Sequence, residues 1–222
     1  MGIGPTRPTG EPGPVPHQGW VTPHIAEEFP GLGVSWIETE AAPGKSPESV
    51  RARLRALSDR FYGSHAITMR ERPIPLAYRV FFRQIGLDPD STRTPIEQLA
   101  FERLRDGAFL SAGLPTDALT IATVETGVAL RAVDADRIEG RLGIRASAPG
   151  ESLAGGGALA QGTLILADEV APAGLLFGET APAHRVESGC RRVAVVAIAV
   201  HAVPRIAVEE ALWMAAGELA EP

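Results

Sequence analysis

The sequence predicts a single α+β domain in which helices pack on a mostly antiparallel or mixed β-structure. Three observations lead to this prediction. Apolar residues recur at helical spacing in several segments that carry capping signals. Short apolar runs rich in β-branched residues lie between turn signals and indicate strands. The chain has 222 residues, 45% of them hydrophobic, which suffices for one domain of ordinary size with a core.

Glycine and proline dominate residues 1–19, which contain almost no large apolar side chains. Such a segment cannot bury enough surface to offset the entropy lost on ordering, so we expect a disordered leader. The folded domain is expected to occupy residues 20–222. Within it, Val34, Trp36 and Ile37 indicate an early strand over residues 33–41.

Three helices are predicted next. The first starts at Ser46, which precedes a proline suited to the first helical position, and Gly63 ends it. The second covers residues 76–85, where aromatic side chains recur at the spacing of a buried helical face. The third begins at Thr94, which has the form of a capping box with Glu97.

Residues 116–126 are ambiguous between strand and helix. Their threonines and valine favour a strand, whereas Asp117 near the start and Gly127 at the end favour a helix. Residues 128–133 lead into the next region. Residues 134–180 then predict a string of short β-segments joined by tight turns.

Two short apolar runs within this last region end in carboxylates. One run precedes Asp168 and Glu169, and the other, residues 174–177, precedes Gly178 and Glu179. A carboxylate directly after a buried strand lies at a rim or on the floor of a pocket. We therefore expect a polar contact to a ligand at these positions.

Composition and charge exclude several classes of protein. The formal net charge of −6 argues against a protein that binds nucleic acid mainly through its overall positive charge. A local basic patch is compatible with this net charge. Cys190 is the single cysteine, so an internal disulfide framework is excluded. The longest apolar run, residues 193–200, is too short for a bilayer and predicts a central strand buried on both faces. A closing helix is expected over residues 206–219, and the protein is expected to be cytoplasmic, without a membrane partner.

The sequence carries no motif for metal or cofactor chemistry. Residues 155–157 form a glycine run without the lysine of a phosphate loop, and we expect a hairpin there. Spacings typical of zinc ligands are absent. His184 and Cys190 lie close in sequence, but no third orienting residue accompanies them, so a cysteine nucleophile is not expected.

Four blocks stand in the order YRVFFRQIGLDPDSTRTPIEQL, DADRIEGRLGIRASAPGE, GTLILADE and LLFGE. The last three resemble the B3/B4 domain of the bacterial phenylalanyl-tRNA synthetase β subunit, and the first is similar to the matching part of free-standing B3/B4-domain proteins. The blocks stand in the same order and at the same spacings as in that family. The resemblance covers the chain from about Phe29 to its end. It implies a tRNA-binding protein, possessing no ligase activity of its own, that hydrolyses mischarged aminoacyl-tRNA esters in trans, such as tyrosine on phenylalanine tRNA.

The resemblance also implies roles for particular residues. Glu179 stands where the family reads the tyrosine hydroxyl, and a site that hydrogen-bonds a hydroxyl rejects an analogue lacking one. The Gly178 backbone would line the pocket. Arg131 replaces a family histidine, cannot act as a general base, and is expected to contact the terminal nucleotide. Thr120 replaces an asparagine that many relatives carry.

Other interpretations of these residues stay open. Arg93 and Arg145 are assigned as tRNA contacts, although for Arg93 we favour a structural role, because an arginine beside a helix start often ties down a loop. Glu179 can pair with a nearby arginine in a turn. Glu151 follows a strand and is expected to be structural. The catalytic residues are not identified, because editing of this kind relies on a positioned water and backbone groups.

Two further functions compete with editing. The chain can be a non-catalytic module that binds RNA or an amino-acid-like small molecule, or a remnant that contacts proteins. A pocket with a basic rim favours tRNA, a pocket without such a rim favours a small ligand, and a filled pocket favours the protein contact.

Overall fold

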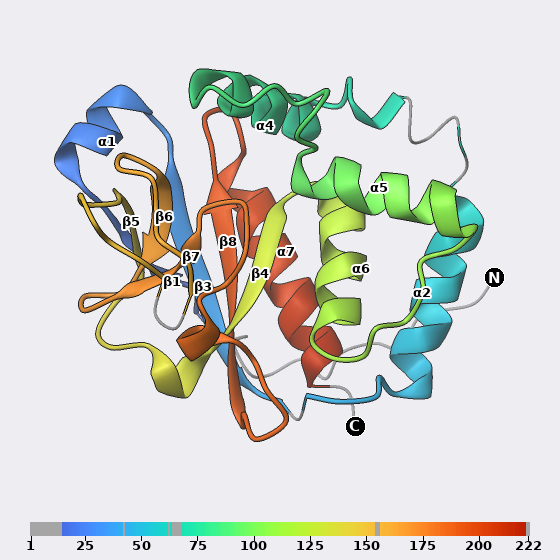
Figure 1. Ribbon diagram of the computed structural model, residues 1–222. Helices are drawn as coiled ribbons and strands as arrows, with labels where there is room; N and C mark the ends of the chain where they lie inside the picture. Colours follow the sequence, from blue (N-terminus) through green and yellow to red (C-terminus); the bar gives the residue numbers. More distant parts are fainter. Residues whose placement is uncertain (1–14, 42, 62, 64–67, 154–155, 221–222) are drawn as a thin grey trace.

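Two four-stranded sheets lie side by side, and helices cover the far face of one of them (Figure 1). The computed structural model describes residues 15–41, 43–61, 63, 68–153 and 156–220. The predicted α+β class is confirmed. Sheet A contains, in spatial order, β1 (His17–Gln18), β3 (Gly33–Glu40), β8 (Arg192–Ala199) and β4 (Ala129–Asp134), all antiparallel. Sheet B contains β2 (Trp20–Val21), β5 (Gly143–Ala146), β6 (Leu164–Ala167) and β7 (Pro172–Leu175), and only β2 and β5 run parallel.

Strand β8 is buried on both faces, as predicted. Ala194, Val196 and Ile198 belong to the core between the two sheets. The alternate residues Val193 and Val195 belong to a second core between sheet A and the helices. The period of two in a strand thus divides one apolar run between two cores.

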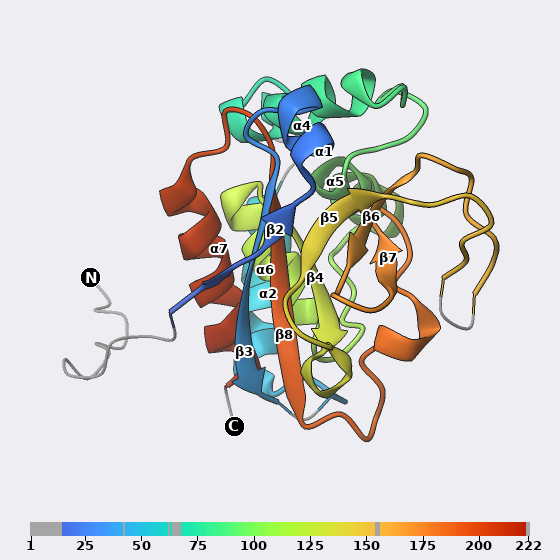
Figure 2. The same cartoon turned by 90° about the vertical axis from the view of Figure 1, so that its left-hand side faces the viewer.

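The helices form the layers on the other side of sheet A. Helices α6 (Thr116–Thr126) and α7 (Arg205–Leu219) pack on the sheet, and α2 (Glu48–Arg60) and α5 (Pro95–Asp106) form an outer layer with a core of their own. Helix α4 (Pro73–Gln84) crosses the top of the molecule, and the short α1 (Pro23–Glu28) lies beside sheet B (Figures 1 and 2). None of the described helices is both long and apolar enough to cross a membrane.

The ambiguous segment over residues 116–126 is helix α6. Asp117 in its first turn is buried and accepts hydrogen bonds from the Ser46 and Ser111 hydroxyls and from the Ala112 amide. Gly127 ends the helix with a φ of 82°, a conformation that favours glycine. The capping signals therefore decided the structure here, and the β-propensity of threonine and valine did not.

Helix α5 begins as its sequence predicts. The Thr94 hydroxyl donates to a Glu97 carboxylate oxygen, and both halves of the capping box are present. Gly107 ends the helix with a φ of 78°. Helix α4 is longer than expected, because it starts at Pro73, which occupies the first helical position.

Other boundaries also differ from the expectation. Helix α2 has Pro47 at its N-cap and ends at Arg60, not at Gly63, and the Ser46 hydroxyl donates to Asp117 instead of capping the helix. Of the predicted leader, residues 1–14 lie outside the described part, but His17 and Gln18 pair with Trp36 and Ser35 as strand β1. Residues 135–137 form a short 3-10 helix, so the string of β-segments predicted from residue 134 begins only at Gly143. Near the glycine run, residues 154–155 are not described, and Ser152 and Ala158 form an antiparallel bridge.

Candidate functional site

A cavity of about 300 Å³ lies where the edges of both sheets meet helix α5. Strand β4 is the last strand of sheet A, and β7 is the last strand of sheet B. In Figure 2 both strands lie below α5. The cavity is lined by Arg93, Pro95, Gln98, Leu99, Glu102, Ala129, Leu130, Arg131, Leu176, Phe177, Gly178, Thr180 and Ile198. We call it the Arg131 cavity.

One wall of the Arg131 cavity is a tight hairpin that follows β7. The Leu175 amide donates to the Glu179 carbonyl at 2.9 Å, and the chain returns alongside itself through a bridge between Gly174 and Thr180. A Cβ on Gly174 would lie 2.6 Å from the Glu179 carbonyl oxygen, so only glycine fits. At the tip, the Phe177 ring packs against aromatic side chains of α4, with 5.1 Å between the ring centres of Phe177 and Phe82.

Arg131 links the hairpin to sheet A. It lies on the same face of β4 as Ala129 and Val133, which face sheet B. Its Nη2 donates to the carbonyls of Leu176 at 3.1 Å and Gly178 at 3.0 Å. These carbonyls hold the guanidinium at the cavity wall.

The charge of Arg131 has no counterion in the described parts of the chain. Its Nη1 is buried without a hydrogen-bond partner, and no carboxylate lies within 4.0 Å of the guanidinium. Burial lowers the pKa of Arg131 to about 10, so the group still carries its proton at neutral pH. A buried cation with an unused donor beside a cavity favours an anionic ligand, because such a ligand supplies both the charge and the acceptor.

Three of the residues singled out in the sequence meet at this cavity. Arg131, Gly178 and Arg93 all line it. Glu179 lies between two lining residues but does not line the cavity itself, and its carboxylate is 3.7 Å from the Arg185 guanidinium. Its side chain is 58% exposed. Glu179 therefore pairs with a nearby arginine in a turn, which is the alternative to reading a ligand hydroxyl.

Thr120 and Arg145 lie elsewhere. Thr120 is buried in α6 and is not among the described residues that line the cavity. Arg145 donates to both carboxylate oxygens of Glu151, at 2.8 and 2.5 Å, and this pairing raises the pKa of Arg145 and lowers that of Glu151. Glu151 also accepts from the Ala148 amide at 2.7 Å, so the pair holds a turn.

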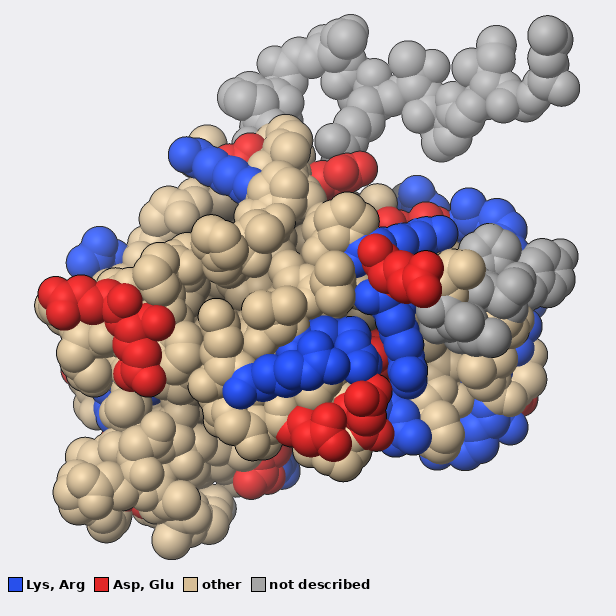
Figure 3. All heavy atoms as spheres, turned by 90° about the horizontal axis from the view of Figure 1, so that it is seen from above, with Lys and Arg blue, Asp and Glu red and all other residues tan. Residues whose placement is uncertain are grey.

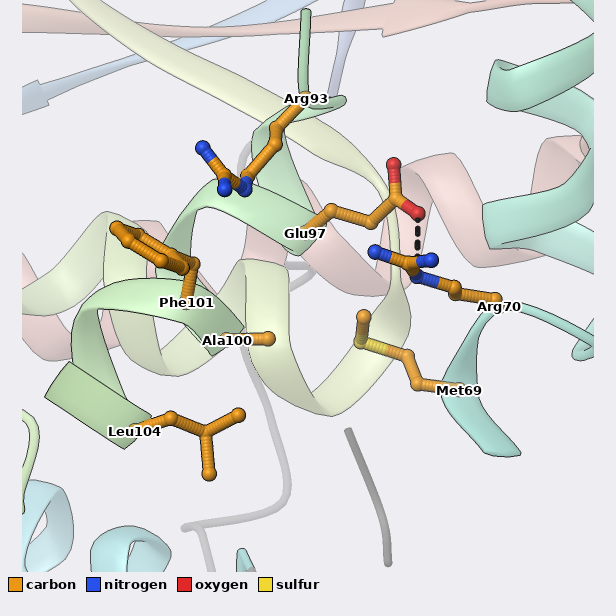
Figure 4. A pocket seen from close by; sticks show the side chains of 7 residues that line it. All are labelled: Met69, Arg70, Arg93, Glu97, Ala100, Phe101 and Leu104. Atoms are coloured by element: carbon orange, nitrogen blue, oxygen red, sulfur yellow. Dashed lines mark ion pairs between the residues drawn. The ribbon is translucent and has the colours of Figure 1, made fainter. Parts of the chain in front are cut away.

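A second cavity, of about 290 Å³, lies on the other side of α5 (Figure 4). We call it the Phe101 cavity. It is lined by Met69, Arg70, Arg93, Glu97, Ala100, Phe101 and Leu104. Arg93 lines both cavities, and its guanidinium carbon lies 3.8 Å from the centre of the Phe101 ring. Sequence reasoning missed this cavity, although Phe101 lies outside the apolar stripe of α5 and is 39% exposed.

Positive charge is concentrated in the helical segment that borders both cavities. Residues 51–105 contain eleven of the twenty arginines and only six acidic residues. Most of these arginines pair with carboxylates, and blue and red atoms adjoin over much of the face in Figure 3. Within the described residues of this segment, Arg72, Arg83, Arg93 and Arg103 have no carboxylate within 4.0 Å. The basic rim of the two cavities therefore consists of a few separate arginines and not of a continuous positive patch.

The Arg131 cavity lacks the side chains of an obvious nucleophile or general base. Its lining contains neither histidine nor cysteine among the described residues, and the one carboxylate, Glu102, accepts from Gln98 at 2.7 Å. The described residues also contain no group of histidine, cysteine and acidic side chains that could hold a metal ion. Any hydrolysis here would depend on a bound water and the hairpin backbone.

Comparisons with protein-family models and with curated proteins found no relative of the chain. No protein-family model matches the chain, and no curated protein is significantly similar to it. The fold and the site define an α+β protein with a cavity beside an arginine that has no carboxylate partner among the described residues.

Proposed function

We propose that the Arg131 cavity receives the aminoacylated 3′ end of a tRNA and that the protein hydrolyses a mismatched aminoacyl ester in trans. The observation that carries the proposal is the Arg131 guanidinium, which borders the cavity with a buried, unused donor. A phosphate of the terminal nucleotide supplies the missing charge and accepts that hydrogen bond. The resemblance to the B3/B4 editing domain supports the choice of an aminoacyl ester.

The remaining parts of the site suit a small acyl group. Leu130, Leu176 and Phe177 give the cavity an apolar side, and its volume is at the lower end of the range for small-molecule sites. The ester is already reactive, so positioning a water beside the hairpin suffices for hydrolysis. Glu179 at the return of the hairpin is the residue we propose for reading the side-chain hydroxyl, which requires its carboxylate to leave Arg185.

A second candidate is the binding of an amino-acid-like acid without catalysis. Arg131 favours it, because a guanidinium pairs with a carboxylate through two parallel hydrogen bonds. The pairing of most neighbouring arginines with carboxylates also favours it, since few charges are left for an RNA backbone. In this case the ligand is a free acid, and Glu179 has no part in binding.

The test is deacylation of tyrosyl-tRNA(Phe) by the purified full chain, with phenylalanyl-tRNA(Phe) as the control substrate. We expect selective loss of the tyrosyl ester, abolished in Arg131→Met. Selectivity should disappear in Glu179→Ala. Arg105→Gln is the matched control, because Arg105 is exposed, pairs with Asp106 and lines neither cavity.

Two results would contradict the proposal. If neither ester disappears faster than without protein, the editing activity is excluded for this substrate. If Arg131→Met retains full activity, the reaction does not use this cavity. Binding of free tyrosine to the wild type, measured by calorimetry and lost in Arg131→Met, would then establish the second candidate.

A further inference from the structure

The Phe101 cavity combines an exposed aromatic ring with two cations. In Figure 4, Arg93, Phe101 and Leu104 lie on one side of it, and Met69 and Arg70 lie on the other. The Phe101 ring and the side chains of Met69 and Leu104 form an apolar surface. A planar base can stack or pack on such a surface, while the arginines at its border can meet a phosphate.

Arg93 has its full hydrogen-bonding capacity available. Its guanidinium stacks on the Phe101 ring, and within the described residues it makes no hydrogen bond and has no carboxylate within 4.0 Å. A guanidinium carries its N–H donors at its edge, so stacking leaves them free. Stacking also fixes the side chain at the border of both cavities, which reduces the entropy lost when it binds a ligand.

The acidic residue of this cavity is already neutralised. The Glu97 carboxylate accepts from Arg79 at 2.5 Å and from the Thr94 hydroxyl at 2.9 Å, and it pairs with Arg70 at 3.0 Å. Arg79 pairs in addition with Asp90 at 2.7 Å. The three arginines, including Arg93, exceed the two carboxylates by one charge, so an anion entering from solvent meets a positive site.

Helix α5 separates the two cavities as a ridge. Pro95, Gln98 and Glu102 line the Arg131 cavity, whereas Glu97, Phe101 and Leu104 line the Phe101 cavity. These two sets lie on neighbouring faces of the helix, because residues three and four apart share a face. Arg93, just before the helix begins, is the one described residue that lines both cavities. A ligand that occupies both must therefore pass over Arg93.

We propose that the Phe101 cavity is a nucleotide subsite, in which the base packs against Phe101, Met69 and Leu104 and the phosphate binds Arg93 and Arg70. The inference rests on the proposed function for the identity of the whole ligand, and it extends the site from one cavity to two. The acylated terminal nucleotide then occupies the Arg131 cavity, with its phosphate at Arg131, and the nucleotide that precedes it lies across the α5 ridge. Arg93 and Arg70 hold the phosphate of that preceding nucleotide.

The experiment is calorimetric titration of the full chain with AMP and with adenosine. We expect AMP to bind and adenosine to bind more weakly, because only AMP carries the phosphate. Arg93→Gln should weaken AMP binding by about tenfold or more, the effect of losing a charge-assisted hydrogen bond. Phe101→Ala should weaken AMP and adenosine alike, because it removes the contact with the base.

The controls separate this inference from the proposed function. Arg105→Gln, on the same helix, should bind AMP as the wild type does, and circular dichroism checks that each variant is folded. Arg131→Met should also retain AMP binding while losing deacylation. Absence of AMP binding, or equal affinities of Arg93→Gln and Arg105→Gln, overturns the subsite. Loss of AMP binding in Arg131→Met but not in Arg93→Gln places the phosphate in the Arg131 cavity and likewise overturns it.

Discussion

Removing the Tyr78 hydroxyl should destabilise the domain beside the Arg131 cavity. This hydroxyl donates to the Ile198 carbonyl at 2.5 Å and accepts from the Ala129 amide at 3.0 Å. It thereby connects α4 to both β8 and β4. Tyr78 is 1% exposed, and burial raises the pKa of Tyr78, so the hydroxyl stays a proton donor at any ordinary pH.

Tyr78→Phe keeps the ring and its packing but leaves two buried backbone groups without partners. An unpaired buried donor or acceptor costs about 1–3 kcal/mol, so the two together should lower the free energy of unfolding by roughly 2–6 kcal/mol. In a chain of this size, that corresponds to a fall in Tm of roughly 5–25 °C. Most of the loss should appear as a lower urea midpoint with an unchanged slope.

Urea denaturation followed by tryptophan fluorescence measures this difference. Thr39→Val is the matched control, because it removes a hydroxyl whose hydrogen bond is exposed, and it should change stability by less than about 0.5 kcal/mol. A Tyr78→Phe variant as stable as the control would refute the reasoning. It would mean that water from the cavity satisfies the Ile198 and Ala129 groups.

Three other substitutions should change stability or ligand binding in a direction that the structure defines. Glu97→Gln should lower the free energy of unfolding, measured by urea denaturation, by about 2–4 kcal/mol, because it removes the carboxylate of the buried ion pair with Arg79. An unchanged free energy of unfolding would show that the domain does not need this ion pair. Arg145→Gln should lower stability at pH 7, and its difference from the wild type should shrink in acid. The partner carboxyl, Glu151, has a lowered folded pKa, so its contribution exists above the unfolded pKa of about 4.3 and is lost as the pH falls through the folded value; a difference that does not shrink as the pH is lowered would contradict this. Gly174→Ala should reduce Tm and ligand binding, because its Cβ meets a carbonyl oxygen at 2.6 Å, whereas Gly157→Ala, with open space around it, should change neither.

The sequence predicted those parts of the fold that depend on local signals. The capping box at Thr94, the two-sided strand β8 and the positions of the main helices follow from patterns within a few residues. Boundaries were less accurate where tertiary pairing decided them. His17 and Gln18 have no local strand signal, and they become a strand because they lie against the edge of β3.

The site could be predicted only in part, because it depends on the orientation of side chains brought together from distant segments. Arg131 and Gly178 were both singled out, but their hydrogen bond joins residues 47 positions apart and follows from the packing of two sheet edges. No pattern in the sequence states that Arg131 lacks a carboxylate partner among the described residues, since nine other basic residues outside the helical segment 51–105 have the same side-chain type or charge. Only the three-dimensional surroundings distinguish them.

The hairpin after β7 decides how the most informative sequence motif is to be interpreted. Gly178 and Thr180 line the cavity, so the intervening Glu179 lies on the other side of the extended chain, beside Arg185. A role for Glu179 in reading a ligand therefore requires the hairpin to change conformation, whereas Arg131 already lines the cavity. This difference makes the order of effects testable. If the hairpin is rigid, Arg131→Met should abolish binding and Glu179→Ala should leave it intact, and if it rearranges around a ligand, both variants should lose selectivity.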